Sequence, residues 1–206
     1  MNVKVKICGI TSVEDALAAV DAGADALGFM FYASSPRCVT RDAAAAIIRA
    51  LPPFVAKVGV FVNPTVEEVR QAIADGGLDT LQFHGEEPPE FCRQFGLKAL
   101  KAFRVQGPEM LKMLPDYSAM AWLLDSFIAG TRGGTGNTFN WEIAAQAVKL
   151  GGHVILAGGL TPENAAEAAR KVRPYGLDVS SGVESAPGRK DAAKVRAFIA
   201  AARGIK

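Results

Sequence analysis

The feature that most constrains this chain is a regular alternation of two sequence patterns along its 206 residues. Short apolar runs rich in Val, Ile, Leu and Phe predict buried β-strands, and alanine-rich stretches with apolar residues three and four positions apart predict amphipathic helices. The predicted strands cover residues 3–8, 24–31, 54–61, 79–84, 97–103, 120–125, 153–158 and 175–180. The predicted helices cover residues 12–23, 41–51, 65–77, 88–96, 108–114, 140–152, 161–172 and 191–203.

Eight strand–helix units indicate a parallel sheet, because two parallel strands need a crossover connection that is usually a helix. At this chain length, eight units fit a closed barrel better than an open doubly wound sheet. The first predicted strand is also not followed by the glycine-rich dinucleotide fingerprint of an open Rossmann sheet. We therefore predict an α/β fold, a single-domain (β/α)8 TIM barrel that spans residues 1–206.

Several helix starts carry capping signals. Thr11 and Thr65 each stand three residues before a glutamate, which is the pattern of a capping box. Thr161 is followed by a proline, which predicts an N-cap with proline at the first helical position. Glycines mark helix ends at positions 23, 76–77, 96 and 151–152.

Composition excludes several classes of protein. Half of the residues are hydrophobic and 21% are charged, which is typical of a globular chain. The net charge is only +2 and the sequence has no stripe of basic residues, so neither nucleic acid nor a membrane surface is expected as a partner. No apolar run reaches membrane-spanning length, and no signal-peptide core precedes the first strand. Cys8, Cys38 and Cys92 are odd in number and form no CxxC pair, which predicts neither a disulfide framework nor a metal cluster. We expect a cytoplasmic protein.

The barrel prediction places the functional site at the carboxyl ends of the strands, where barrels of this class build their active sites. The ends of the first, fourth, sixth and eighth predicted strands supply Cys8, His84, Asp125 and Asp178. The loop after the second strand supplies Arg37.

Cys8 stands at the end of the first predicted strand. Alternation turns Val5 and Ile7 toward the helices, and Lys6 and Cys8 toward the barrel axis. A buried cysteine is usually an inert small hydrophobe. At the rim, however, its thiol, with an ordinary pKa of about 8.5, is a candidate general base, and the nearby charge of Lys6 would favour the thiolate.

The other rim residues have functional and structural interpretations. Asp125 ends an apolar strand, where desolvation would raise its pKa and let it act as an acid, although it could also brace a loop. Arg37 could be surface charge or a bidentate clamp on a substrate carboxylate. His84 could serve the site or be a satisfied structural histidine.

Glycine-bearing loops follow the last three predicted strands, in the region where barrels bind phosphate through exposed backbone N–H groups. Glycine lets the backbone approach an anion closely because it has no Cβ. The candidate phosphate-binding residues are Gly133, Gly134, Gly158, Gly159, Gly182 and Val183. We expect Gly158 and Gly159 to precede the helix start at Thr161, and Gly182 and Val183 to open an extra helical turn.

Seven motifs in order along the chain resemble the phosphoribosylanthranilate isomerase family. They are KICGIT, GFMFYASSPR, VGVFVN, QFHGEE, the segment from Asp125 to GGTGNTFNW, LAGGLTPEN and DVSSGVESAPGRKD. Two small departures are Phe83, where the family would have leucine, and Asn140, where it often has aspartate. Neither falls on a catalytic position of the family.

The resemblance implies an Amadori rearrangement that needs no cofactor and acts on a small phosphorylated substrate of tryptophan biosynthesis. It assigns Asp125 as the general acid, Cys8 as the general base and Arg37 as the residue that holds the anthranilate carboxylate. The glycine loops would hold the phosphate. His84, Asp178 and Ser180 would line the pocket, and no residue would bind a metal.

Two other functions stay open at this point. A histidine-pathway phosphoribosyl isomerase performs the same chemistry on a substrate with two phosphates, but that family would carry a carboxylate instead of Cys8. A catalytically silent barrel could bind a phosphorylated metabolite, although binding alone does not need both Cys8 and Asp125. The sequence leaves the choice between a monomer and a homodimer undecided.

Overall fold

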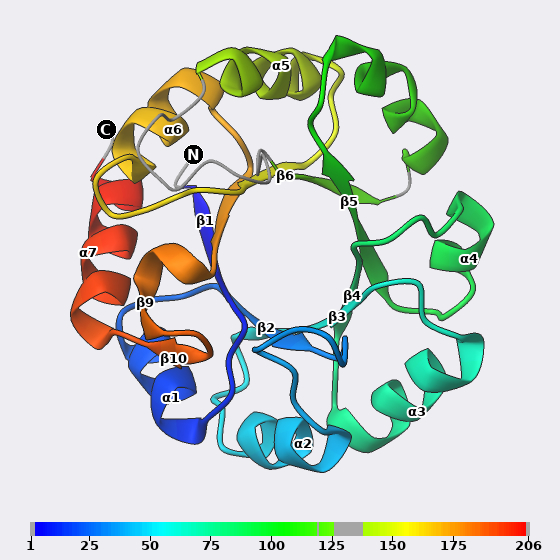
Figure 1. Ribbon diagram of the computed structural model, residues 1–206, viewed down its shortest axis with the longest axis vertical. Coiled ribbons are helices and arrows are strands. Elements are labelled where there is room, and N and C mark those ends of the chain that lie inside the picture. Colours follow the sequence, from blue (N-terminus) through cyan, green and yellow to red (C-terminus); the bar gives the residue numbers. More distant parts are fainter. Residues whose placement is uncertain (1–2, 119, 126–137, 205–206) are drawn as a thin grey trace.

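The computed structural model describes residues 3–118, 120–125 and 138–204, and the side chains of 138–140 lie outside this description. Eight parallel strands close into a barrel in sequence order, with the helices forming an outer ring (Figure 1). The strands are β1 Lys4–Cys8, β2 Ala26–Met30, β3 Ala56–Phe61, β4 Thr80–Phe83, β5 Lys98–Arg104, β6 Ala121–Asp125, β7 Val154–Ala157 and β8 Gly176–Val179. The predicted fold class is confirmed, and each predicted strand agrees with an observed one to within two residues at either end.

Seven α-helices lie within the described residues. They are α1 Val13–Asp21, α2 Arg41–Arg49, α3 Val66–Gly76, α4 Pro89–Arg93, α5 Thr138–Lys149, α6 Ala165–Val172 and α7 Ala192–Arg203. The helix predicted over 108–114 is wrong in type, because the chain forms two 3-10 turns there, η1 Pro108–Lys112 and η2 Leu114–Tyr117. Pro115 lies in the first turn of η2, where the missing N–H of proline leaves no helical hydrogen bond unmade.

Of the three predicted helix N-caps, one is confirmed and two are wrong. Thr65 forms the predicted capping box with Glu68. The prediction for Thr11 is wrong, because the neighbouring Ser12 is the N-cap of α1 and accepts from the Asp15 N–H. The Thr161 prediction is also wrong, since a turn follows it and α6 begins only after its N-cap, Asn164.

Two hydrophobic layers hold the barrel. The larger one packs the helices against the outer face of the sheet and includes Val5, Ile7, Phe29 and Phe83. The smaller one fills the barrel lumen and consists of Cys8, Val58, Val60, Leu100, Ala102, Leu123, Ile155 and Ala157. Alternate residues of β1 divide between these layers as a strand's period of two requires, so Cys8 points inward.

A short hairpin after β8 was not predicted. The 3-10 turn η3 Ser181–Val183 leads into the strand β9 Glu184–Ala186, which pairs antiparallel with β10 Arg189–Lys190. Both strands lie outside the barrel sheet, near α1 and β1 in Figure 1. This hairpin extends the rim of the barrel beside the carboxyl end of β1.

Candidate active site

The predicted rim residues gather at one end of the barrel because all eight strands run parallel and finish there. Cys8 is the last residue of β1, Asp125 is the last residue of β6, and His84 directly follows β4. Asp178 lies one residue before the end of β8, a position further from the rim. Since β7 and β8 separate β6 from β1, Cys8 and Asp125 stand on different sides of the lumen.

Cys8 occupies a tight position made possible by glycine on the neighbouring strand. Its residue is 6% exposed, and its register partner across the ladder is Gly28. A Cβ added at Gly28 would lie 2.8 Å from Cys8 Sγ and 3.0 Å from Lys6 Nζ. The missing side chain at Gly28 therefore makes room for both the thiol and the ammonium group.

The buried ion pair below Cys8 determines how Lys6 can act. Lys6 Nζ donates to Asp178 Oδ1 at 3.0 Å, and both side chains are at most 8% exposed. Burial disfavours the Lys6 cation, but the charges of Asp178 and Cys8 and their hydrogen bonds to Lys6 together outweigh burial and raise the pKa of Lys6. Lys6 is thus a charged residue already paired with a carboxylate.

Lys6 favours the Cys8 thiolate, as the sequence predicts, but it does not decide the net pKa of Cys8. Burial of the thiol is the largest influence and raises the pKa of Cys8, while Lys6 and, more weakly, Lys190 act in the opposite direction. Asp178 adds its own negative charge and reinforces the rise. In the protein without substrate, the nearby cations therefore do not overcome desolvation and the thiol form is favoured.

On the other side of the lumen from Cys8, Asp125 is joined to a short chain of polar side chains. His84 Nε2 lies 3.2 Å from Asp125 Oδ2, and His84 Nδ1 lies 3.2 Å from Gln82 Nε2. The Gln82 amide nitrogen can only donate, so Nδ1 is the acceptor of this contact and an N–H on Nε2 faces Asp125. Gln82 is 1% exposed, and its Oε1 has no hydrogen-bond partner among the described residues.

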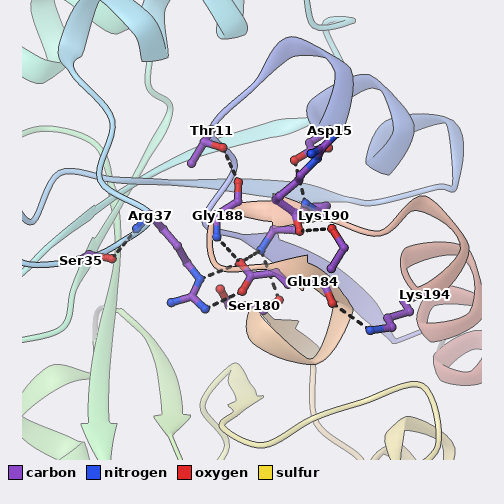
Figure 2. A network of polar contacts seen from close by, with 11 residues as sticks. Thr11, Asp15, Ser35, Arg37, Ser180, Glu184, Gly188, Lys190 and Lys194 are labelled. Carbon is purple, nitrogen blue, oxygen red and sulfur yellow. Dashed lines mark hydrogen bonds and ion pairs between the residues drawn. The ribbon is translucent and has the colours of Figure 1, made fainter.

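Arg37 reaches the rim from the loop after β2 and meets the hairpin that follows β8 (Figure 2). Its Nε donates to Glu184 Oε1 at 2.7 Å and its Nη2 donates to Glu184 Oε2 at 2.6 Å. Lys190 Nζ donates to the same carboxylate at 2.8 Å. The Arg37 side chain is 20% exposed, so this guanidinium group is both held by the protein and open to a ligand.

Gly9 explains how Arg37 can lie beside Cys8. The backbone of Gly9 has φ +76°, a left-handed conformation that favours glycine. A Cβ there would lie 2.5 Å from Arg37 Cδ and 3.1 Å from Ser180 Oγ. The turn after β1 therefore lets the Arg37 side chain pass close to the end of the strand, and it brings the predicted pocket residue Ser180 to the same place.

The glycine loops after β7 and β8 pack against each other. Gly158 and Gly159 have φ values of +85° and +63°, and a Cβ at Gly159 would meet nothing within 4 Å. A Cβ at Gly182 would collide with the carbonyl oxygen of Leu160, so this glycine permits the close approach of the two loops. Val183 is buried in η3, the extra turn that was expected here. Gly133 and Gly134 lie outside the described residues.

A cavity of about 660 Å3 opens at the other end of the barrel, where the strands begin. Lys4, Phe54, Lys98 and His153 are among the residues that line it. None of the described candidate site residues lines this cavity. The candidate site lies at the opposite end of the barrel, with Cys8 and Asp125.

Comparison with known proteins identifies the family. The model of the family described as N-(5'phosphoribosyl)anthranilate (PRA) isomerase matches residues 5–201. The chain belongs to this family. An N-(5'-phosphoribosyl)anthranilate isomerase of Trichlorobacter lovleyi is 57% identical over 197 residues, which cover 96% of each chain.

Solved structures of the family have the same architecture. The phosphoribosyl anthranilate isomerase of Thermotoga maritima superimposes with a TM-score of 0.92 at 41% identity, covering 98% of this chain and 100% of the other. Another phosphoribosyl anthranilate isomerase, solved in complex with reduced 1-(o-carboxyphenylamino)-1-deoxyribulose 5-phosphate, gives a TM-score of 0.89 at 40% identity, with coverages of 98% and 100%. The (β/α)8 barrel is thus shared along the whole length of the isomerase.

The sequence did not reveal two charged residues of this isomerase's rim, Glu184 and Lys190. The dipeptide Pro187-Gly188 marks a turn between them, which was the only local signal of a hairpin. Their contact with Arg37 depends on the closure of the barrel, because β8 pairs with β1, and β1 in turn pairs with β2, whose following loop carries Arg37. Among the described residues, no cluster of three or more His, Cys, Asp or Glu side chains is arranged to hold a metal ion, and no helix is long and apolar enough to cross a membrane.

Proposed function

We propose that this chain converts N-(5-phosphoribosyl)anthranilate into 1-(2-carboxyphenylamino)-1-deoxyribulose 5-phosphate, an Amadori rearrangement in tryptophan biosynthesis. The observation that carries this proposal is the placement of a carboxyl group and a thiol on different sides of one barrel rim, in a chain whose whole length matches the isomerase family. The reaction is an internal redox change, so acid–base groups suffice and no cofactor is required.

Asp125 is the proposed general acid. It gives a proton to the furanose ring oxygen, the bond from C1 to that oxygen breaks, and the amine lone pair forms a C1=N Schiff base. The Nε2–H of His84, 3.2 Å away, then donates to the carboxylate that remains. A hydrogen bond to the charged form of an acid stabilises it, so His84 assists the proton transfer.

Cys8 is the proposed general base. It removes the proton from C2, a C1=C2 double bond forms, and the electrons of the Schiff base return to nitrogen to give an enolamine. The enol then tautomerises by delivering a proton to C1 and forming the C2 ketone, which leaves the molecule isomerised with no net gain of atoms or electrons. Burial raises the pKa of Cys8, so the thiolate that accepts the C2 proton is the minor form at neutral pH, and the charge of Lys6 favours that form.

The two ends of the substrate would be held by different groups. Arg37 is proposed to bind the anthranilate carboxylate through the part of its guanidinium group that Glu184 does not occupy. The backbone at Gly158, Gly159 and Gly182 is proposed to cradle the phosphate, and the open space beside Gly159 supports this. Gly133 and Gly134, which follow β6 in the sequence, are proposed to contribute as well.

Localisation and assembly stay predictions. Cys8, Cys38 and Cys92 are free thiols, as expected for a protein kept in a reducing cytoplasm. A further solved relative from Thermotoga maritima, at 39% identity, is described as monomers generated from a dimeric phosphoribosyl anthranilate isomerase. We propose that this chain works as a monomer or a homodimer, and sedimentation velocity would distinguish the two.

The function is tested by following the loss of fluorescence of the anthranilate substrate with the purified protein. The two-phosphate substrate of the histidine pathway is assayed in parallel. Turnover of the anthranilate substrate alone is the expected result. Turnover of the histidine-pathway substrate alone would refute the proposal, and saturable binding without turnover of either would indicate a binding protein.

A further inference from the structure

Glu184 and its partners form a buried ionic network on the β9–β10 hairpin, next to the guanidinium group of Arg37 (Figure 2). We propose that Glu184 is a positioning residue that orients Arg37, and that it thereby sets the selectivity of the isomerase for a substrate with a carboxylate on its aromatic ring. This inference rests on the carboxylate-binding role proposed for Arg37. It adds a residue whose effect passes through another side chain.

The contact geometry leaves one edge of the guanidinium group available. Glu184 occupies Nε and one N–H of Nη2, at 2.7 and 2.6 Å. Arginine has five N–H donors in a planar fork, so Nη1 and the second N–H of Nη2 still form a pair of parallel donors. No residue in the described part of the chain is hydrogen-bonded to Nη1. A second carboxylate fits that edge in the same bidentate manner.

Burial and counter-charge make Glu184 a rigid partner. The Glu184 side chain is 5% exposed and that of Lys190 is 1% exposed. Burial alone would raise the pKa of Glu184, but its bonds to Arg37 and Lys190 outweigh burial and lower it, so the carboxylate is ionised at neutral pH. Burial lowers the pKa of Lys190, and its ion pair with Glu184 counteracts this. Glu184 is paired with both Arg37 and Lys190, so two cations share one carboxylate and the cluster keeps positive charge for the substrate.

The hairpin that carries Glu184 is itself fixed to the barrel at several points. The Lys190 backbone N–H donates to Asp15 Oδ2 at 2.8 Å, which ties β10 to α1. Lys194 Nζ of α7 donates to the Glu184 carbonyl oxygen at 2.9 Å, and the Thr11 hydroxyl donates to the Gly188 carbonyl oxygen. Arg37 is therefore braced by a hairpin that is anchored on two helices.

Glu184, which orients Arg37, directly follows the proposed phosphate-binding residues in the sequence. Gly182 and Val183 lie in η3, and Glu184 follows at once as the first residue of β9. The segment that would cradle the phosphate and the residue that orients Arg37 therefore share one short, anchored piece of backbone. Such an arrangement fixes the separation between the phosphate and carboxylate sites, and so selects substrates in which these two groups are spaced correctly.

The experiment compares two substrates in each variant. The first is N-(5-phosphoribosyl)anthranilate, and the second is the corresponding aniline conjugate, which lacks the carboxylate. In Glu184→Gln, the preference in kcat/KM for the first substrate is expected to fall about tenfold to a hundredfold, chiefly through KM, because the two-point contact with Arg37 is lost. The kcat/KM for the aniline conjugate is expected to stay within about twofold of the parent protein.

Three further variants are measured with the same two substrates. Arg37→Ala should remove the preference completely. Glu167→Gln, which alters an exposed ion pair with Lys171, is the matched control and should keep the full preference. Glu184→Asp keeps the charge but is one methylene shorter, so it tests the same contact if Glu184→Gln folds poorly. The inhibition constant of inorganic phosphate should be unchanged in Glu184→Gln.

The outcomes separate this inference from the role of Arg37. An equal loss of kcat/KM on both substrates in Glu184→Gln and Glu184→Asp would show that Glu184 only stabilises the fold, and would overturn the proposal. A retained preference in these variants, with the preference abolished in Arg37→Ala, would also overturn it while leaving the Arg37 role intact. A retained preference in Arg37→Ala would refute the role of Arg37 itself.

Discussion

Two sides of this rim are built differently: the base side, named for Cys8 as the proposed base, and the acid side, named for Asp125 as the proposed acid. Around Cys8, the charged groups Lys6, Asp178, Glu184 and Lys190 are all at most 8% exposed, and they are joined by short ion pairs. Around Asp125, the contact to His84 is 3.2 Å long and both side chains are about one-fifth exposed. The base side is thus a dry, fixed environment, and the acid side is open to solvent.

This difference suits the two steps of the proposed reaction. Abstraction of a proton from carbon needs a base that is held in an exact position and shielded from water, because misplacement by a fraction of an ångström lowers the rate. An acid that protonates a ring oxygen must be reprotonated in each cycle, and partial exposure gives it access to solvent protons. Changes on the base side should therefore cost more than comparable changes on the acid side.

The largest effect is expected for Cys8→Ala. Removing the thiol eliminates the proposed base, and turnover should fall about 10⁴-fold with the fold intact. Steady-state kinetics and a circular-dichroism spectrum check both parts of this statement. Cys38→Ala, which changes an exposed thiol, is the control and should be fully active. Full activity of Cys8→Ala would refute the proposed role of Cys8 as the general base.

Asp125→Asn should lower kcat about 10³-fold, because an amide cannot donate the proton that opens the ring. The comparison predicts a smaller loss than for Cys8→Ala, since water can reach this side of the rim. Single-turnover kinetics with a saturating amount of protein measure the ring-opening step directly. Unchanged kinetics would exclude Asp125 as the acid, and Asp116→Asn on the exposed turn η2 serves as the control.

Gly28→Ala should lower kcat about 10²-fold without changing any proposed catalytic group. The new Cβ would stand 2.8 Å from Cys8 Sγ, and displacement of the thiol misaligns the base. Gly107→Ala is the matched control, because a Cβ there meets nothing within 4 Å. If both alanine variants had the same kcat as the parent protein, the base side would not be as tightly fixed as the structure indicates.

Alkylation by iodoacetamide tests the ionisation of Cys8. A raised pKa means a smaller thiolate fraction at neutral pH, and burial also limits access, so Cys8 should react at least about tenfold more slowly than exposed Cys38 at pH 7. The rate at Cys8 should keep rising with pH beyond 9. Mass spectrometry of tryptic peptides gives both rates from one sample. Faster labelling of Cys8 than of Cys38 at pH 7 would contradict the desolvated thiol.

The smallest effect is expected for His84→Ala. Loss of one long hydrogen bond to Asp125 should cost about 1 kcal/mol, or about fivefold in kcat, with KM nearly unchanged. Measurement of kcat/KM and kcat at several pH values separates an effect on proton transfer from an effect on binding. A loss as large as that of Asp125→Asn would make His84 an essential participant in the acid step.

The candidate site was partly visible in the sequence. Cys8, His84 and Asp125 could be placed at the rim because each ends or follows a strand with a clear apolar pattern, and parallel strands share one rim. Glu184 and Lys190 could not be linked to Arg37, since about 150 residues separate Arg37 from both and no local pattern joins them. Gln82 looked like an ordinary strand residue until the structure placed its amide against His84.

The sequence by itself determined the eight strand–helix units, their order and the face of β1 on which Cys8 lies, because these depend on periodicity and local propensity. Tertiary structure decided which caps and turns formed, as Ser12 replaced Thr11 as the N-cap of α1 and two 3-10 turns replaced the helix predicted over 108–114. It also decided the ionisation of Cys8, since the pKa of a thiol depends on burial and on every charge around it. Closure of the barrel brings the loop after β2 to the hairpin after β8, and no local sequence pattern predicts the resulting contact between Arg37 and Glu184.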